Sequence, residues 1–346
     1  MNLGFNTTFV RQTIGISYGV LCFILYYSGI YYIIEYLRRH TPVILMYHSV
    51  NIHDFPYIYQ DNIVGVENFE RQMVYLSSRK RIISLSELAK YLEHNNQFPP
   101  NVAVITFDDG YYDFYANAHS VLKKHKISST IFPITKLLDT GELKWEDMLT
   151  YLVNATKVES LSLYAKGKVT NYNLTSPSHK QSCIRKMDST LLKMNEFERA
   201  ACFSKIKEQL KVSSKPSDHV MLGWNEIQEL QKEGFVSFGS HTHSHVDLAV
   251  LNPKMAELEI SQSKQEIENF LSIPCTLFSY PFGKRHNFNQ GIKNCLRDMG
   301  FSAAVTTIRG SVSKGSDPFE LKRIAAIDES SYRFKCSLIG IALQRR

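Results

Sequence analysis

The chain has 346 residues, of which 44% are hydrophobic, 12% aromatic and 21% charged. This apolar content excludes a disordered or collagen-like chain, and the six cysteines are too sparse for a small disulfide-stapled scaffold. The formal net charge of +7 is compatible with an anionic membrane surface or an acidic polymer as partner, and it does not require nucleic acid.

The first feature along the chain is an uncharged run over residues 12–34. As one helix it would be about 35 Å long, enough to cross roughly 30 Å of hydrocarbon. Its tyrosines also fit a helix that lies in the headgroup layer, and a buried helix of a globular domain is the third alternative. We therefore expect residues 1–41 to form a hydrophobic membrane segment, single-pass or interfacial. Arg11, Arg38 and Arg39 flank the run but leave the side of the membrane open.

After Pro42, short apolar runs alternate with amphipathic stretches. The expected strands cover 43–50, 103–108, 129–134, 236–240, 276–280 and 303–307. The expected helices cover 68–77, 84–93, 117–124, 224–233, 253–271 and 290–299. This order predicts an α/β domain over residues 42–346, with a parallel sheet or βα barrel and the functional groups at the carboxyl ends of the strands.

One segment, from about 140 to 221, breaks the alternation. It is rich in Lys, Ser, Asn and Leu, and it contains no convincing strand. Apolar residues recur there at roughly helical spacing. We expect a helical insertion at one end of the barrel, and its contact with substrate stays open.

The first chemical motif is Thr106-Phe107-Asp108-Asp109-Gly110, at the end of a strongly apolar strand. Because side chains alternate along a strand, the two carboxylates should point in different directions. One can then bind a metal while the other stays free for proton transfer, and the glycine allows a sharp turn. An acidic turn or helix N-terminus would explain this motif taken alone.

The second motif, His241-Thr242-His243-Ser244-His245, follows another apolar run. His241 and His245 are four residues apart, so on a helical turn both imidazoles would face the same way and His243 would point elsewhere. Two imidazoles and one carboxylate form a donor set that leaves metal coordination positions open. With the acid pair on another strand of the same sheet, the motif predicts a divalent metal site.

Two further stretches complete a family pattern: Ser279-Tyr280-Pro281-Phe282-Gly283 and Ile44-Leu45-Met46-Tyr47-His48. Together the four motifs resemble the polysaccharide deacetylase family, the NodB-homology carbohydrate esterases. The resemblance covers roughly residues 42–330, in the order of the family.

The resemblance implies an irregular (β/α)7-type barrel and a metal-dependent hydrolase. Asp109, His241 and His245 would hold a divalent metal, most often Zn2+, and Asp108 would be the general base. The reaction would remove acetyl groups from N-acetylated sugars of a polysaccharide or lipid-linked glycan, which breaks a carbon–nitrogen bond other than a peptide bond. The implied partners are the acetylated glycan and, through the N-terminal segment, membrane lipid, with no protein partner.

The sequence departs from the family at two points. Ser279 stands where many members have an arginine that orients the base, and Arg323 is the candidate replacement. A late Leu-x-His motif that would supply the general acid is missing, so the candidate proton donors are His48, His286, water on the metal and Asp108 itself.

The expected substrate or oxyanion contacts are Tyr280, Pro281, Phe282, His48 and Arg323. The same departures support an alternative function, a catalytically inactive glycan-binding barrel at the membrane.

Overall fold

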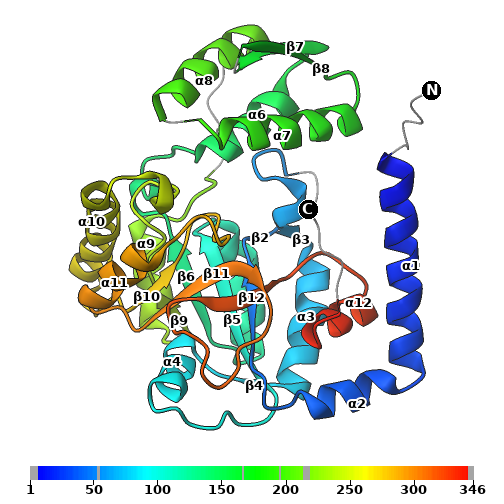
Figure 1. The fold of residues 1–346 in the computed structure, drawn as a ribbon, viewed down its shortest axis with the longest axis vertical. Coiled ribbons are helices and arrows are strands. Elements are labelled where there is room, and N and C mark those ends of the chain that lie inside the picture. Colours follow the sequence, from blue (N-terminus) through cyan, green and yellow to red (C-terminus); the bar gives the residue numbers. More distant parts are fainter. Residues whose placement is uncertain (1–6, 53–54, 166, 195, 213–218, 342–346) are drawn as a thin grey trace.

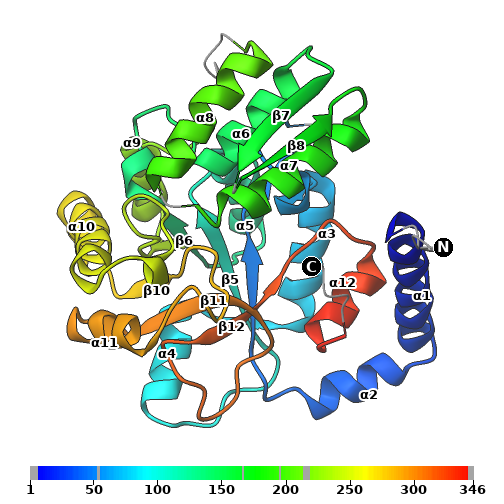
Figure 2. The same cartoon turned by 45° about the horizontal axis from the view of Figure 1, so that its top comes forward.

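A curled parallel sheet forms the centre of the computed structural model, which describes residues 7–52, 55–165, 167–194, 196–212 and 219–341. Its strands follow the order β10-β11-β12-β1-β5-β6-β9, and β4 pairs with β5 at one side. A parallel bridge between Ser240 and Phe278 joins the chain after β9 to β10. The sheet is thus a nearly closed barrel surrounded by helices (Figures 1 and 2), which confirms the predicted irregular (β/α)7-type barrel.

The elements of the barrel follow the predicted alternation closely. The barrel strands are β1 (Val43–Tyr47), β4 (Arg81–Ile82), β5 (Val102–Asp109), β6 (Ser129–Pro133), β9 (Val236–Phe238), β10 (Leu277–Ser279), β11 (Ala303–Arg309) and β12 (Leu321–Ala325). A separate short pair is β2 (Ser49–Val50) with β3 (Ile63–Val64). The helices around them are α3 (Val66–Arg79), α4 (Leu85–Glu93), α5 (His119–Lys124), α9 (Trp224–Lys232), α10 (Pro253–Leu271), α11 (Gln290–Asp298) and α12 (Ser331–Leu338). Strands β3, β4 and β12 and helix α12 were not expected from the sequence.

Local side chains fix where several of these helices begin. Ser84 Oγ accepts the main-chain N–H of Glu87 at 3.0 Å, and Asn252 Oδ1 accepts that of Met255 at 3.0 Å. Each bond satisfies a donor that the first helical turn leaves without an intrahelical partner. These caps define the starts of α4 and α10.

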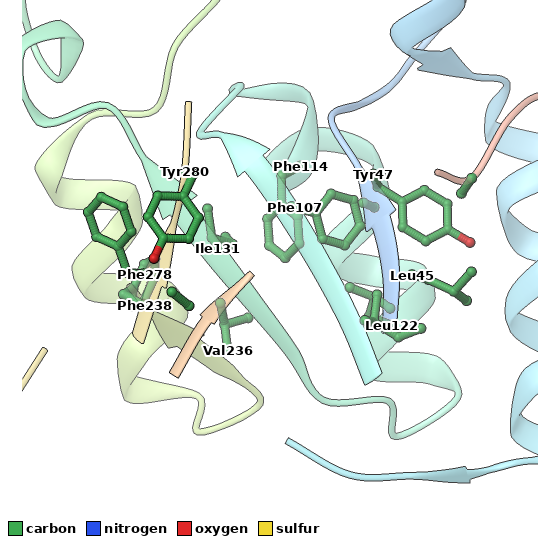
Figure 3. Close-up of a cluster of buried hydrophobic side chains, with 14 of the residues drawn as sticks. Leu45, Tyr47, Phe107, Phe114, Leu122, Ile131, Val236, Phe238, Phe278 and Tyr280 are labelled. Carbon is green, nitrogen blue, oxygen red and sulfur yellow. The ribbon is translucent and has the colours of Figure 1, made fainter. Parts of the chain in front are cut away.

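The apolar side chains of the strands divide between two faces. One set, with Leu45, Phe107 and Ile131, packs against the surrounding helices (Figure 3). The alternate residues, such as Ile44 and Val104, form a second cluster on the inner face of the barrel. Side chains alternate between the two faces with a period of two, so every second residue of a strand lies on the inner face. At the carboxyl ends of the strands these inner residues are polar. That end of the barrel is where the sequence places both acidic and imidazole motifs.

The predicted insertion has its own apolar cluster and lies over one end of the barrel (Figure 1, green). It consists of α6 (Trp145–Ala155), β7 (Ser160–Ala165), β8 (Lys168–Asn173), α7 (Pro177–Leu191) and α8 (Glu196–Leu210). The expectation that it contains no strand was wrong, because β7 and β8 pair as an antiparallel hairpin. In β7 the buried Leu161 and Leu163 alternate with exposed polar residues, a short period-two pattern within a polar segment.

The uncharged N-terminal run forms two helices instead of the expected continuous one. They are α1 (Thr7–Tyr27) and α2 (Ile30–Leu37), with Gly29 between them at φ +83°, a left-handed conformation that glycine adopts without a steric penalty. Among the described residues, no single helix is long and apolar enough to cross a membrane. Residues 16–27 and 30–37 meet that requirement only as a pair, bent by 82°.

Candidate active site

The two acids of the first motif are the last residues of β5, and both are buried. Asp109 has φ +71° and Gly110 has φ +82°, so the chain leaves the strand through two left-handed residues. A Cβ on Gly110 would lie 2.9 Å from Cβ of Pro133, which leaves room only for glycine. This turn is what directs the Asp109 carboxylate away from that of Asp108.

Asp108 is bound on the inner face of the barrel by Arg323 of β12. Arg323 Nη1 donates to Oδ1 at 2.8 Å, and Nη2 donates to Oδ2 at 2.5 Å. Ser279 Oγ donates to Oδ1 at 3.2 Å. Burial alone would raise the pKa of Asp108, but the charge and hydrogen bonds of Arg323 outweigh it and lower this pKa. Arg323 therefore lies beside Asp108, as expected for the substitute arginine, and Asp108 is held as a carboxylate.

Asp109 faces the two imidazoles of the second motif. His241 Nε2 and His245 Nε2 each lie 3.5 Å from Asp109 Oδ1. One ligand atom from each of the three residues lies within 4.8 Å of the other two, so the group could hold a metal ion. All three side chains are buried.

A loop, and not the expected helical turn, brings His241 and His245 together. Residues 241–245 are irregular, and two of them, Thr242 and His245, have positive φ angles of +64° and +58°. His245 N donates to Thr242 Oγ1 at 3.0 Å, which closes the loop. The helical-turn prediction failed because spacing of four is equally compatible with a tight loop of this kind. His243 points away, with its Nδ1 3.1 Å from Glu266 Oε2.

The donor set fits a divalent metal such as zinc. His241 Nδ1 lies 2.7 Å from the carbonyl oxygen of Ser279, so we assign the ring proton to Nδ1 and the free lone pair to Nε2, toward Asp109. Burial would raise the pKa of Asp109, but the nearby Lys144 ammonium and His241 keep it well below its usual range. One carboxylate oxygen with two imidazole nitrogens is a common zinc donor set.

The insertion forms one wall of the site. This contribution was not predicted from the sequence. A cavity of about 450 Å³ includes Asp108, Asp109 and both histidines in its lining. Lys144, whose Nζ donates to Asp109 Oδ2, lies just before α6, and further lining residues of α6 and α7 include Glu146, Arg185 and Asp188. The available signal was the three charged residues at 144, 146 and 147, because they lie in the connection that follows the carboxyl end of β6.

The two histidines proposed as proton donors lie in different places. His48 lines the cavity, and burial lowers its pKa. His286 is exposed and is not among the cavity-lining residues. The structure therefore keeps His48 near the acids and places His286 elsewhere.

The residues of the third motif, 279–283, differ in whether they line the cavity. Phe282 lines it, with its ring centroid 5.0 Å from that of His245. Tyr280 also borders the cavity, but its hydroxyl donates to the carbonyl oxygen of Phe319 at 2.9 Å, and its ring belongs to the hydrophobic cluster of Figure 3. Pro281 is buried and is not one of the lining residues.

Comparison with known proteins identifies related sequences. The sequence profile of the family described as polysaccharide deacetylase matches residues 95–304. The chain is 24% identical over 284 residues to YxkH of Bacillus subtilis (strain 168), which is provisionally named a polysaccharide deacetylase; the match covers 81% of this chain and 70% of that protein. It is 26% identical over 180 residues to the poly-β-1,6-N-acetyl-D-glucosamine N-deacetylase of Staphylococcus aureus (strain MSSA476), covering 47% of this chain and 60% of that enzyme.

The fold has solved counterparts. The Streptococcus pyogenes deacetylase PplD, solved in complex with acetate, matches with a TM-score of 0.58 and 19% identity, covering 86% of this chain and 98% of PplD. That likeness shows the barrel fold, whereas the profile, which spans more than half of the chain, shows the family. The chain belongs to the polysaccharide deacetylase family, and it is accordingly a carbohydrate-deacetylating hydrolase that acts on a carbon–nitrogen bond other than a peptide bond.

Proposed function

We propose that the chain is a metal-dependent N-deacetylase that acts on N-acetylhexosamine residues of a glycan. One observation carries the proposal: the Asp109, His241 and His245 donor set lies beside the Asp108–Arg323 pair in one cavity of about 450 Å³. A metal site with a separate, ionised carboxylate beside it is what hydrolysis of an unreactive amide needs.

Asp109, His241 and His245 would hold the cation, for which we propose Zn2+. When bound, such a cation supplies Lewis acidity that polarises the acetyl carbonyl and makes water a nucleophile near neutral pH. Lys144 binds the second oxygen of Asp109, so Oδ1 is the oxygen that faces the two imidazoles.

Asp108 would act as general base. Its carboxylate accepts two hydrogen bonds from Arg323 and one from Ser279, and a carboxylate has about four lone-pair positions, so it retains acceptor capacity toward water. Asp108 takes one proton as the water oxygen bonds to the acetyl carbon. The carbon–nitrogen bond then breaks, and the leaving nitrogen receives that proton from Asp108. His48, whose pKa burial lowers, lines the same cavity as a neutral imidazole placed for a polar contact with substrate. The products are acetate and the free amino sugar.

For the substrate, we propose a polymer that contains N-acetylglucosamine. The staphylococcal relative, 26% identical over 180 residues, is named for deacetylation of poly-β-1,6-N-acetyl-D-glucosamine. The match spans 60% of that enzyme's length, so the support comes from the shared domain.

The test is acetate release from β-1,6-linked N-acetylglucosamine oligomers by protein stripped of metal and reloaded with Zn2+. We expect activity to return with the metal and to be lost in Asp109→Asn. The exposed Asp298→Asn is the matched control and should behave as the parent. A parent with verified metal that releases no acetate would overturn the proposal, and oligomer binding without turnover would support the inactive glycan-binding barrel instead.

We also propose that α1 and α2 hold the barrel against a membrane surface without crossing it. Their inner faces are occupied: Cys22 and Tyr31 pack with Cys336 and Ile339, and Glu35 pairs with Lys80 at 2.7 Å. Figure 1 shows α1 alongside α12. Pulling α1 out to span a bilayer would break these contacts.

The outer faces of the same helices are apolar. Phe23 is 51% exposed, Ile33 62% and Leu37 74%. Arg39 lies over the Tyr36 ring at 4.0 Å, which combines a cation with an interfacial aromatic residue. Apolar, tyrosine-rich and basic surface together favour an anionic lipid surface as the occupant of this face.

Sedimentation with phosphatidylglycerol vesicles tests the placement. The parent should sediment with the vesicles, and a Phe23→Ser, Ile33→Ser double variant should lose most of this binding while it keeps activity on soluble oligomers. Val169→Ser, which changes an exposed valine in the β7–β8 hairpin, is the control. A parent that ignores vesicles, or that dimerises through this face, would contradict the proposal.

A further inference from the structure

The ring of His245 lies between two carboxylates. Its Nε2 is 3.5 Å from Asp109 Oδ1, and its Nδ1 is 3.5 Å from Glu146 Oε1. Asp109 comes from β5, whereas Glu146 comes from the first turn of α6 in the insertion. The two nitrogens of one imidazole thus face the barrel and the insertion separately.

The atoms on the insertion side are buried and lack hydrogen-bond partners. His245 Nδ1 and both carboxylate oxygens of Glu146 are each buried without a bond. Leaving buried polar groups unpaired is unfavourable, so their juxtaposition points to a bond that forms when the site is complete. A shift of about half an ångström would bring 3.5 Å to a normal N–H···O distance.

The other imidazole shows what the missing bond should do. His241 Nδ1 lies 2.7 Å from the carbonyl oxygen of Ser279, which orients that ring and its tautomer. A histidine that binds a metal through one nitrogen nearly always donates its other N–H to a carboxylate or carbonyl. For His241 the barrel provides this acceptor from its own main chain, and for His245 the facing acceptor is Glu146.

The position of Glu146 is fixed by its neighbours on α6. Asp147 accepts the Tyr111 hydroxyl at 2.8 Å, and the Trp145 ring packs edge-on against Phe203 at 6.2 Å. Leu149, further along the helix, is fully buried in the apolar cluster of the insertion. These contacts place the first turn of α6 against the metal-site side of the barrel.

We propose that Glu146 is a positioning residue for the metal site: it accepts the Nδ1 proton of His245, so that Nε2 keeps its lone pair for the cation. The insertion is then part of the site through a defined contact and not only a cover above it. This inference rests on the proposed function, because His245 is a metal ligand only there.

The test measures metal affinity in the absence of substrate, by competition with a chromophoric chelator for Zn2+. We expect Glu146→Ala to raise the dissociation constant for Zn2+ about 10- to 100-fold, the range found when such an acceptor is removed. Glu146→Gln keeps an acceptor oxygen at the same distance, so its Zn2+ affinity should lie between that of the parent and that of Glu146→Ala. Glu142→Gln, an exposed change just before α6, is the matched control and should bind as the parent does.

The outcomes distinguish the role of Glu146 from the proposed function. If Glu146→Ala fails to fold, the nearly isosteric Glu146→Gln against Glu142→Gln remains the deciding pair, with equal thermal unfolding of the metal-free proteins showing that the fold is intact. If the parent binds Zn2+ and releases acetate while both Glu146 variants bind Zn2+ within about threefold of it, the inference is overturned and the proposed function stands. A parent that binds no Zn2+ overturns the proposed function itself.

Discussion

Arg323 donates to both carboxylate oxygens of Asp108, at 2.8 Å and 2.5 Å. The two residues come from β12 and β5, which β1 separates in the sheet, and both side chains are buried. Arg323 also donates through Nε to the carbonyl oxygen of Thr306 at 2.8 Å. Such a two-pronged contact fixes the plane of the carboxylate as well as its charge. The orientation of the proposed base therefore comes from the last strand of the barrel.

Replacing Arg323 with lysine should shift the pH dependence of the reaction. Arg323 lowers the pKa of Asp108 against the effect of burial, so a single ammonium in its place should let that pKa rise. The acid limb of the profile of kcat/KM against pH then moves to higher pH, and the plateau falls about 10- to 100-fold because the carboxylate is less well oriented. An unshifted acid limb would show that Asp108 is not the titrating base.

Asp108→Asn should separate turnover from metal binding. Removing a general base costs about 100- to 10,000-fold in rate, whereas Asp109, His241 and His245 remain in place. Acetate release measured beside the metal content of the same preparation checks this, with Asp298→Asn as control. Loss of the metal from Asp108→Asn would assign Asp108 to the metal site.

Ser279→Ala should have a small effect, because Ser279 adds one hydrogen bond to a carboxylate that Arg323 already holds. Ser279 Oγ donates to Asp108 Oδ1 at 3.2 Å and accepts from Arg323 Nη2 at 3.1 Å. We expect a loss of about 1 kcal/mol in the free energy of unfolding and a rate within about fivefold of the parent. Chemical denaturation and initial rates measure both, and a loss as large as that of Arg323→Lys would mean that Ser279 carries the orienting role.

The motifs that could be predicted from the sequence are those whose chemistry lies within a few residues. Asp108 and Asp109 adjoin at a strand end, and His241 and His245 lie in one short loop, so residue type and spacing were sufficient to single them out. Most barrel strands before β12 were visible for the same reason, as apolar runs between amphipathic helices, but the two-residue β4 was not.

Contacts that depend on tertiary packing were not predictable. Strand β12 carries Lys322 and Arg323 in its middle, which disguises a strand whose arginine is buried only because Asp108 faces it. Lys144 and Glu146 reach the site only because the insertion packs over the barrel. The bend at Gly29 likewise follows from one glycine inside a run that composition alone assigns to a continuous helix.

The stability of the cavity wall should depend on pH through Asp188 of α7. Burial raises the pKa of Asp188 to about 6 from its usual 3.8. The folded state then binds more protons than the unfolded state between about pH 4 and pH 6, so the contribution of this group to stability falls as the pH rises through that window. Above pH 6 the full penalty of the buried charge remains.

Asp188→Asn removes this penalty. The variant should be more stable than the parent by about 1–2 kcal/mol at pH 7.5, less than the full pKa difference implies because the side chain keeps some contact with water. At pH 4 the two proteins should be equally stable. Urea denaturation at both pH values measures the difference, and Asp298→Asn, which changes an exposed carboxylate, should show none. A gain that is the same at both pH values would contradict the titration of Asp188.

Anomalous X-ray scattering at the zinc edge, from crystals of the Zn2+-loaded protein, tests whether Asp109, His241 and His245 bind one divalent cation. We expect a single strong anomalous peak about 2.0–2.2 Å from Asp109 Oδ1, His241 Nε2 and His245 Nε2. A peak at other residues, or fully loaded protein without a peak at these three atoms, would contradict this expectation.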